Sequence, residues 1–411
     1  MQIRVGAIKT VRKRKGSSMF GNKITFKNSL MAALAGAFMA ATPALAERGV
    51  TDTEIIIGAH TALSGPASIW GVSSTNAARL LFDEVNAKGG IHGRKIRYIV
   101  EDSQYQVPLA VKAMNKLTNR DRVFAIHLAL GTPQNNAVLR RQLAANIPNL
   151  FPVSGAVTMI EPFHRLKFQA LSTYNQQTRA AIRYFHKNKG HKRICAFYQD
   201  TDYGQEIKDA IMQEVSALGL ELVAETRHKS TETEFVGAMT ALKRANCDLI
   251  VFGTIIQDTI IGYATARKLG ITADIVGSQA SNDQIVASAQ GNATQGYYVA
   301  GSTRALYRDS ATPNQLAFIE KYQARYGTTP PVGTQYGYLP TKVLIAALEK
   351  AGRDLTVDKL IAAMEQIRDF DDGIGTPLHS FTPTNHSGSD SVFLDQVQDG
   401  KLRGIADNIH R

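Results

Sequence analysis

The sequence predicts an α/β fold built from two doubly wound parallel-sheet lobes joined by a three-segment hinge. Short apolar runs rich in β-branched residues, such as residues 55–57, alternate with longer segments in which apolar residues recur at helical spacing. This alternation forms two successive series of parallel βα units, which imply two lobes. The chain is expected to cross between the lobes near residues 170, 300 and 382, and three crossings make a hinge about which the lobes can close.

The first series opens with a strand over residues 55–57, which ends at Gly58. A loop rich in turn-forming residues follows, and apolar residues at helical spacing then predict a helix that Ser73 or Ser74 caps and that Gly89 ends. The other elements of this series are predicted as strands at residues 96–102, 123–129 and near 150, and as helices at residues 109–119 and 134–145.

The second series repeats the alternation of helices and strands. Its helices are predicted at residues 178–189, 205–218, 235–245 and 259–269, and its strands at residues 193–198, 221–225, 249–253 and 275–277. Two further helices, at residues 313–326 and 337–351, and a last strand at residues 392–397 follow. In such sheets, ligands usually bind in the crevice at the carboxyl ends of the strands.

Residues 1–46 have the features of a secretory signal peptide. They contain eight Lys or Arg and no acidic residue, an apolar stretch at residues 30–41, and the small residues Ala44 and Ala46. The apolar stretch is shorter than the ~20 residues that a membrane span requires. We therefore expect cleavage after Ala46 and an exported protein; a retained anchor is the alternative, and either Met1 or Met19 can be the true start.

Composition narrows the possible partners and chemistry. The formal net charge of +12 falls to +4 without residues 1–46, so we expect no nucleic-acid partner. The only cysteines, Cys195 and Cys247, are expected to be unpaired and buried, because Cys is among the most often buried residue types. An exported protein can also form a disulfide, which is the alternative.

The sequence contains no recognisable catalytic motif. A G-x-S-x-G elbow, a P-loop, a G-x-G-x-x-G loop and an H-E-x-x-H helix are all missing. His127 lies in an apolar strand with no acid or Cys at a useful spacing, which favours a hydrogen-bonded core histidine over a catalytic base. We expect no catalytic residue, no metal site and no cofactor.

Two loops that follow predicted strands form a candidate ligand site. The first loop contains Leu130, Gly131 and Thr132 and runs directly into a helix, where backbone N–H groups favour an anion. The second loop, residues 154–156 (Ser154, Gly155 and Ala156), offers a hydroxyl and further amides. Together they can hold a carboxylate without an arginine. At each loop the alternative is that its glycine merely makes a turn.

Aromatic residues are expected to cover an apolar ligand from both lobes. Trp70, the only tryptophan, lies in the predicted first βα loop, and Tyr203 lies at a predicted helix start in the second series. Rings with an apolar face and a polar edge suit such a cleft. Tyr203 can equally be a packing residue.

Six motifs are spread over nearly all of the chain after the leader: LSGP, VNAKGGIHGRKI, RVFAIHLALGTP, FPVSGAVT, RICAFYQDTDYGQE and DLIVFGTIIQDTIIGYATARKLG. Together they resemble the periplasmic binding proteins of ABC importers, of the branched-chain amino-acid (leucine-binding protein) type. The resemblance implies the type I periplasmic binding protein fold and a periplasmic location. Residues 47–170 and 301–382 then form the N-terminal lobe, and residues 171–300 and 383–411 form the C-terminal lobe.

The resemblance also implies roles for the site residues, with three departures. In amino-acid-binding members the two loops hold the ligand's carboxylate, aromatic residues match Trp70 and Tyr203, and a second-lobe acid pairs with the ammonium. Here Leu130 stands where a Ser is usual, and Ile255 stands where an aromatic is usual. Gln279 stands at the acidic position and offers only a carbonyl oxygen. Neighbouring acids that can replace the missing charge are Asp200, Asp202 and Asp258.

These observations predict an exported, monomeric substrate-binding protein of an ABC transporter that passes its ligand to a membrane complex of permease and ATPase. The ligand is a small carboxylate-bearing molecule: an organic or aromatic acid, or a hydrophobic or branched-chain amino acid. Two other functions stay open. One is a ligand-sensing receptor component of the same fold, and the other is an exported hydrolase.

Overall fold

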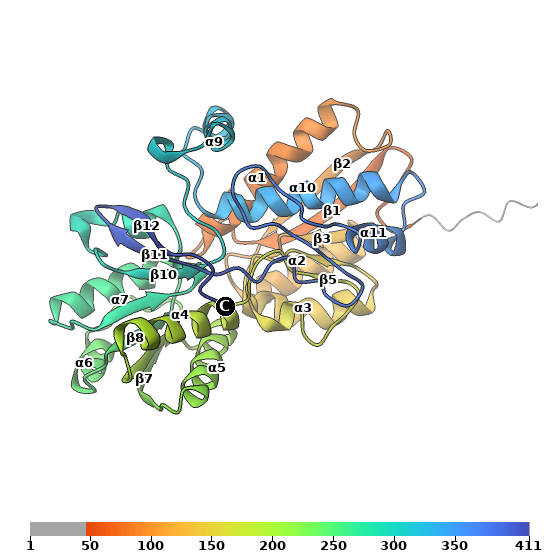
Figure 1. The fold of residues 1–411 in the computed structure, drawn as a ribbon. Helices are drawn as coiled ribbons and strands as arrows, with labels where there is room; N and C mark the ends of the chain where they lie inside the picture. Colours follow the sequence, from red (N-terminus) through yellow and green to blue (C-terminus); the bar gives the residue numbers. More distant parts are fainter. Residues whose placement is uncertain (1–46, 411) are drawn as a thin grey trace, which may run out of the picture. The chain divides into compact units, whose positions relative to one another are not determined.

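The computed structural model describes residues 47–410. The predicted signal peptide and its cleavage position after Ala46 lie outside the described residues. Within the described part of the chain, the strands form two separate sheets, one of five strands and one of seven. Figure 1 shows the helices gathered around these two sheets.

The five-stranded sheet has the order β2-β1-β3-β4-β5, and all its pairings are parallel. Its strands are β1 (Glu54–Thr61), β2 (Lys95–Asp102), β3 (Ala125–His127), β4 (Asn149–Leu150) and β5 (Lys167–Phe168). Helices that pack on or beside it are α1 (Ser68–Ala87), α2 (Val107–Asn119), α3 (Thr132–Ala144), α9 (Pro313–Tyr326), α10 (Gly333–Ala351) and α11 (Val357–Met364). We call this sheet and its helices the first lobe.

The seven-stranded sheet has the order β12-β11-β10-β9-β8-β6-β7. Five strands are parallel: β6 (Ile194–Gln199), β7 (Leu222–His228), β8 (Leu249–Gly253), β9 (Asp274–Gly277) and β10 (Tyr298–Gly301). An antiparallel hairpin of β11 (Phe393–Gln398) and β12 (Lys401–Ala406) extends its edge. Its helices are α4 (Tyr174–Lys189), α5 (Asp202–Ala217), α6 (Val236–Arg244), α7 (Ile256–Lys268) and α8 (Gln284–Ala287). We call this sheet and its helices the second lobe.

The burial of the strands explains why the apolar runs fold this way. Every residue of β6 and β8 is buried, as expected for central parallel strands covered by helices on both faces. The edge strand β7 alternates partly buried and exposed residues instead. The predicted α/β fold with parallel-sheet lobes is therefore confirmed.

Helix α1 starts earlier than the sequence predicts. It begins at Ser68, so Trp70 lies in its first turn and not in the preceding loop. Ser73 and Ser74 do not cap the helix; they lie inside it, and the Ser74 hydroxyl donates to the backbone oxygen of Trp70 at 2.7 Å. The helix starts directly after the turn-forming stretch that contains Pro66, because Ile69 and Trp70 already continue its packed face.

The chain passes between the sheets in three places. After β5, Ser172 lies next to Ser302, which follows β10, and their hydroxyl oxygens are 2.5 Å apart. The third segment runs alongside the first, since the Gly388 N–H donates to Gln169 O at 2.8 Å before β11 begins. The ring of Phe381 still packs against first-lobe aromatics, with its centroid 5.7 Å from that of Phe168. The lobe boundaries at residues 170, 300 and 382 stay a prediction.

Cys195 and Cys247 form a disulfide, so the prediction that they are unpaired is wrong. Their Cα atoms are 5.9 Å apart. Strand order explains the pairing: β6 lies directly beside β8, Cys195 is opposite Ile250, and Cys247 lies three residues before Ile250. Cys195 is fully buried as predicted, and Cys247 is partly buried.

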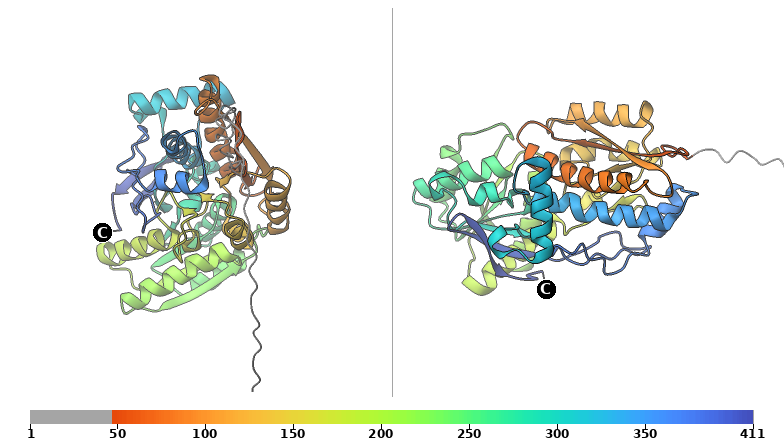
Figure 2. Two further views of the ribbon diagram at one scale, coloured as in Figure 1. Left: turned by 90° about the vertical axis from the view of Figure 1, so that its right-hand side faces the viewer. Right: turned by 90° about the horizontal axis from the view of Figure 1, so that it is seen from above.

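Helix α9 packs across the first lobe. The views in Figure 2 show it crossing near α1 and α10. The Tyr326 hydroxyl donates to the backbone oxygen of Asn76 in α1 at 2.8 Å, and the ring centroid of Phe318 is 4.6 Å from that of Tyr338 in α10. No helix within residues 47–410 is long and apolar enough to cross a membrane.

Candidate ligand-binding site

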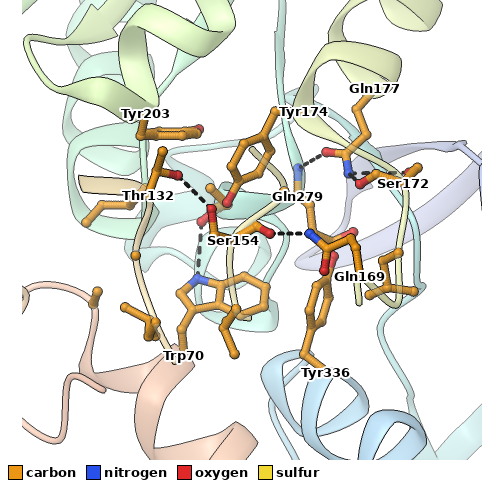
Figure 3. A pocket seen from close by; sticks show the side chains of 18 of the residues that line it. Trp70, Thr132, Ser154, Gln169, Ser172, Tyr174, Gln177, Tyr203, Gln279 and Tyr336 are labelled. Atoms are coloured by element: carbon orange, nitrogen blue, oxygen red, sulfur yellow. Dashed lines mark hydrogen bonds between the residues drawn. The ribbon is translucent and has the colours of Figure 1, made fainter. Parts of the chain in front are cut away.

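A cavity lies where the two lobes meet, and residues of both lobes line it (Figure 3). Its volume is about 50 Å³, several times the ~10–15 Å³ that one buried water needs. Nine of the ten predicted site residues line it: Trp70, Leu130, Gly131, Thr132, Ser154, Gly155, Tyr203, Ile255 and Gln279. Ala156 does not line it; it is fully buried beside the wall, and its N–H donates to Ser154 Oγ at 3.3 Å.

The rest of the wall comes from residues that the sequence analysis did not single out. They are Ala67, Tyr105, Val153, Gln169, Leu171, Ser172, Tyr174, Gln177, Ala280 and Tyr336. Half of them lie in the segment that follows β5 or in the first turn of α4, and Tyr336 lies in α10, far away in the sequence. A role of any wall residue in ligand binding stays a prediction.

The two predicted loops meet at one end of the cavity. Thr132 Oγ1 and Ser154 Oγ are 2.7 Å apart. The Gly131 N–H donates to Val153 O at 3.2 Å and so joins the loops. Gly131 has a φ of 99°, a conformation that residues with a side chain rarely adopt, so a substitution there would strain the loop.

This end of the cavity has unused hydrogen-bond donors. The backbone N–H groups of Thr132 and Ser154 have no partner among residues 47–410. Thr132 is also the first residue of α3, so its N–H lies at the positive end of the helix dipole. One hydroxyl proton is used between Thr132 and Ser154, so the other hydroxyl and the two free amides can receive an anionic oxygen.

Two aromatic pairs, one from each lobe, face each other across the cavity (Figure 3). Trp70 and Tyr336 of the first lobe form an edge-to-face pair with centroids 5.3 Å apart. Tyr174 and Tyr203 of the second lobe form a similar pair at 4.9 Å. Trp70 Nε1 donates to Ala280 O at 3.2 Å, which links the two lobes through the wall of the cavity.

Tyr203 both packs and lines the cavity. Its side chain is almost fully buried, and its hydroxyl donates to Thr254 O at 3.1 Å and lies 2.9 Å from Ser278 Oγ. Burial raises its pKa well above the usual value, so the phenol stays neutral. The two interpretations that the sequence left open are thus compatible.

Gln279 does not present its carbonyl oxygen to the cavity, which corrects the sequence-based expectation. Its Oε1 accepts from the backbone N–H groups of Ser302 at 2.6 Å and Thr303 at 3.4 Å. A backbone N–H can only donate, so this orientation of the amide is fixed. Its Nε2 is buried and has no partner within the described part of the chain. A polar contact of this side chain with a ligand would therefore be a donation from Nε2.

None of the nineteen wall residues is an Asp, Glu, Lys, Arg or His. The three acids that the sequence suggested as substitutes also lie outside the wall. Asp200 is exposed, and Asp202 Oδ2 accepts from Asn136 Nδ2 of the first lobe at 2.8 Å. Asp258 is buried, its Oδ2 accepts from Gln199 Nε2 at 2.8 Å, and burial raises its pKa to about 7.

The prediction that His127 is a hydrogen-bonded core histidine is confirmed. His127 is fully buried, and its Nε2 lies 2.8 Å from Thr341 Oγ1 of α10. Burial lowers its pKa to about 3. Across residues 47–410 no group of three His, Cys, Asp or Glu side chains is arranged to hold a metal ion.

Comparison with known proteins gives the family. The family model described as periplasmic binding protein matches residues 54–401, which is most of the chain. The chain belongs to the periplasmic binding protein family. The resemblance to the branched-chain amino-acid type is also confirmed, because Leu/Ile/Val-binding protein homologues match nearly the whole chain.

Relatives of this periplasmic binding protein span nearly its whole length. A Leu/Ile/Val-binding protein homolog 7 of Brucella melitensis is 24% identical over 373 residues, which cover 87% of this chain and 92% of that protein. A fatty acid ABC transporter substrate-binding protein from Thermomonospora curvata is 25% identical with a TM-score of 0.78, covering 88% of this chain and 94% of that one.

A branched chain amino acid ABC transporter protein from Thermus thermophilus, solved with bound valine, has a TM-score of 0.79 at 16% identity. The match covers 87% of this binding protein and 97% of that one, and it bears on the fold alone. The family is one of exported substrate-binding proteins and not of enzymes.

Proposed function

We propose that this binding protein serves an ABC importer: it captures a small ligand between its lobes and delivers it to a permease and ATPase complex in the membrane. The family and a cavity whose wall comes from both lobes support this proposal. A relative named as a fatty acid ABC transporter substrate-binding protein supports it as well. Deletion of the gene, with the permease and ATPase genes intact, should abolish uptake of the ligand.

The ligand in this proposal carries a carboxylate and an apolar or aromatic body, but no α-amino group. The observation that carries it is the absence of any charged side chain among the wall residues. An ammonium group enclosed there has no carboxylate to pair with, and an unpaired buried charge costs several kcal/mol. A zwitterionic amino acid is therefore disfavoured.

The carboxylate and the body of the ligand each have a suitable part of the wall. One hydroxyl and the free N–H groups of Thr132 and Ser154 supply donors for the carboxylate, and the start of α3 supplies a favourable dipole. The two aromatic pairs and the apolar Leu130 and Ile255 suit a flat or branched apolar body. Gln279 can add a donor but no acceptor for an ammonium.

Calorimetry with matched ligands tests this ligand class. Leucine and 4-methylpentanoate have the same carbon skeleton and differ only in the α-amino group, and benzoate tests an aromatic body. We expect the two acids to bind at least about 100-fold more tightly than leucine, which corresponds to about 2.7 kcal/mol. Micromolar binding of leucine without binding of either acid would refute the proposed ligand class.

Export follows from the proposed signal peptide, with cleavage after Ala46. The residues directly after this position already pack on the first lobe: Arg48 Nη1 donates to Thr118 O at 2.6 Å, and Glu47 Oε2 accepts from Val357 N at 3.3 Å. N-terminal sequencing of protein from the periplasmic fraction should begin at Glu47. An intact leader on that protein would contradict this proposal.

A further inference from the structure

We infer that Glu206 and Asp283 latch the two lobes together and thereby position the walls of the cavity. Both carboxylates belong to the second lobe, and each accepts a hydrogen bond from a backbone N–H of the first lobe. The distances are 2.8 Å from Val157 N to Glu206 Oε1 and 3.2 Å from Val332 N to Asp283 Oδ2. Neither carboxylate lines the cavity. The inference rests on the proposed function, because it takes the cavity as the ligand site.

The Glu206 latch joins two segments that carry wall residues. On the second-lobe side, Glu206 follows the wall residue Tyr203 by three positions in α5. On the first-lobe side, Val157 follows Ser154 by three positions, in the loop proposed to hold the carboxylate. This hydrogen bond therefore fixes the distance between the carboxylate loop and the aromatic wall of the other lobe.

The Asp283 latch has the same arrangement on another part of the wall. Asp283 follows Ala280 by three positions, and Val332 precedes Tyr336 by four positions, about one turn of α10. Both latches thus lie a few residues from the wall, at separate places along the junction of the lobes. Their loss should widen the cavity without removing any wall side chain.

The two amides have no acceptor within their own lobe. Val157 begins the short 3-10 helix η1 (Val157–Met159), whose N-cap Ala156 has no polar side chain. Val332 is the N-cap of α10, which has no side-chain cap either. The second lobe supplies the missing acceptors, and Gln284 Oε1 adds a second one for Val332 at 3.1 Å.

The latch carboxylates also have no cationic partner. Within residues 47–410 no ion pair involves Glu206 or Asp283. Burial raises the pKa of both carboxyls, that of Asp283 to about 6. The hydrogen bond from Val157 N thus compensates Glu206, and the bonds from Val332 N and from Ile285 N of its own lobe together compensate Asp283. Hydrogen bonds to a charged acceptor are stronger than neutral ones.

The two side chains differ in how many oxygens they use, which gives a matched pair of substitutions. Glu206 accepts from the first lobe through Oε1 alone, so Glu206→Gln keeps the acceptor, whereas Glu206→Ala removes it. Asp283 uses both oxygens, because Oδ1 also accepts from Ile285 N at 3.0 Å. Asp283→Asn leaves one carbonyl oxygen for two donors, and Gln284→Ala removes the other acceptor of Val332 N, so the double variant D283N/Q284A should break this latch.

Hydrogen exchange on the protein without added ligand tests the latch. We would follow the segments that contain Val157 and Val332 in the wild type and in E206A, E206Q, D283N/Q284A and the control D209A. Asp209 lies on the same helix as Glu206, is exposed, and accepts only from Gln205 in its own helix. Circular dichroism would show that each variant is folded.

If the latches hold the lobes together, breaking one should loosen the other. We expect E206A and D283N/Q284A each to accelerate exchange about tenfold in both segments, E206Q to accelerate it less than E206A because it keeps a neutral acceptor, and D209A to match the wild type. Exchange that changes only in the segment nearest the substitution, or in neither segment, would overturn the inference. Because no ligand is needed, failure of benzoate or leucine to bind would bear on the proposed function alone.

Discussion

The two lobes bury opposite kinds of ionisable side chain. In the first lobe, β1 contains His60 and β3 contains His127; both are fully buried, and burial lowers their pKa values to about 4 and about 3. In the second lobe, burial raises the pKa of Asp258 to about 7 and that of Asp283 to about 6. The stability of the two lobes should therefore respond to pH in opposite directions, although both contain the same kind of doubly wound sheet.

The signs follow from linkage between protonation and folding. A buried neutral histidine contributes stability that is fully present above its unfolded pKa, about 6.5, and is lost as the pH falls toward 4. A buried carboxyl with a raised pKa contributes stability that is fully present below about 4 and is lost as the pH rises through 7. As the pH falls from 7 to 4, the buried histidines should lower the stability of the first lobe, whereas the buried acids should not lower that of the second.

Two residues work against this contrast. Asp372 is a buried acid on the first-lobe side, where its backbone oxygen accepts from Lys342 of α10. His228 lies in the second lobe with its Nε2 3.6 Å from Asp258 Oδ2, and burial lowers its pKa. The second lobe therefore has one buried histidine beside its buried acids. It also has the disulfide, for which the first lobe has no counterpart, and this difference gives the largest expected effect.

Loss of the disulfide should weaken the second lobe most. Cys195 and Cys247 are 52 residues apart, and closing a loop of that length in the unfolded chain corresponds to about 4 kcal/mol of stability. We expect C195A/C247A to lose roughly this much, with faster hydrogen exchange confined to the second lobe. Reduction of the wild type is the control, since it breaks the bond without removing the side chains. Equal exchange in both lobes would contradict the contrast.

Acid should destabilise the first lobe selectively. Neutral burial of His60 corresponds to about 2 kcal/mol lost between pH 6.5 and pH 5. Hydrogen exchange in β1 and β3 reports the stability of the first lobe alone, and exchange in β6 and β8 reports that of the second. After correction of the rates for the direct effect of pH, exchange in β1 and β3 should accelerate from pH 6.5 to pH 5, and H60Q should reduce this acceleration. Slower exchange in β1 and β3 on acidification would refute the prediction.

Asp258, a buried acid of the second lobe, should lower the stability of that lobe as the pH rises. Asp258→Asn removes the charge but keeps an acceptor for Gln199, so we expect stabilisation by about 2 kcal/mol at pH 8 and little change at pH 5. Hydrogen exchange in β8 and α7 at the two pH values measures this effect. The exposed Asp200→Asn is the control and should be silent. Destabilisation at pH 8 would mean that the carboxylate is compensated after all.

Much of the fold could be predicted because parallel strands and their helices have strong local patterns. Helix α9 matches its predicted range, and β8 does as well. The failures come from information that is not local. The pairing of Cys195 with Cys247 depends on which strands are neighbours, and the antiparallel β12 at the sheet edge has no continuous apolar run. The start of α1 was predicted too late, because Ser73 and Ser74 are typical capping residues but here bond to the backbone inside the helix.

Only those site residues that lie in loops or helix starts directly after strands could be predicted from the sequence. Thr132 and Ser154 come from such loops, and the topology brings them together. Tyr105, Tyr174 and Tyr336 reach the cavity from a loop and two helices that are far apart in sequence, so no local signal identifies them. The orientation of the Gln279 amide depends on backbone donors that follow β10, which only the three-dimensional structure provides.

The smallest expected effect concerns how the lobes share the ligand, because the first lobe supplies the polar end of the cavity. Thr132→Val keeps the shape of the side chain and removes its hydroxyl, so we expect about tenfold weaker binding of 4-methylpentanoate or benzoate, whereas Thr132→Ser should bind nearly as the wild type. Ser154→Ala should cost a similar factor. The two hydroxyl oxygens are 2.7 Å apart, so the double variant T132V/S154A should lose less than the product of the two factors. Calorimetry on the four proteins decides this. Unchanged affinity in T132V and S154A would mean that the carboxylate binds elsewhere and that these first-lobe hydroxyls do not form the polar end of the site.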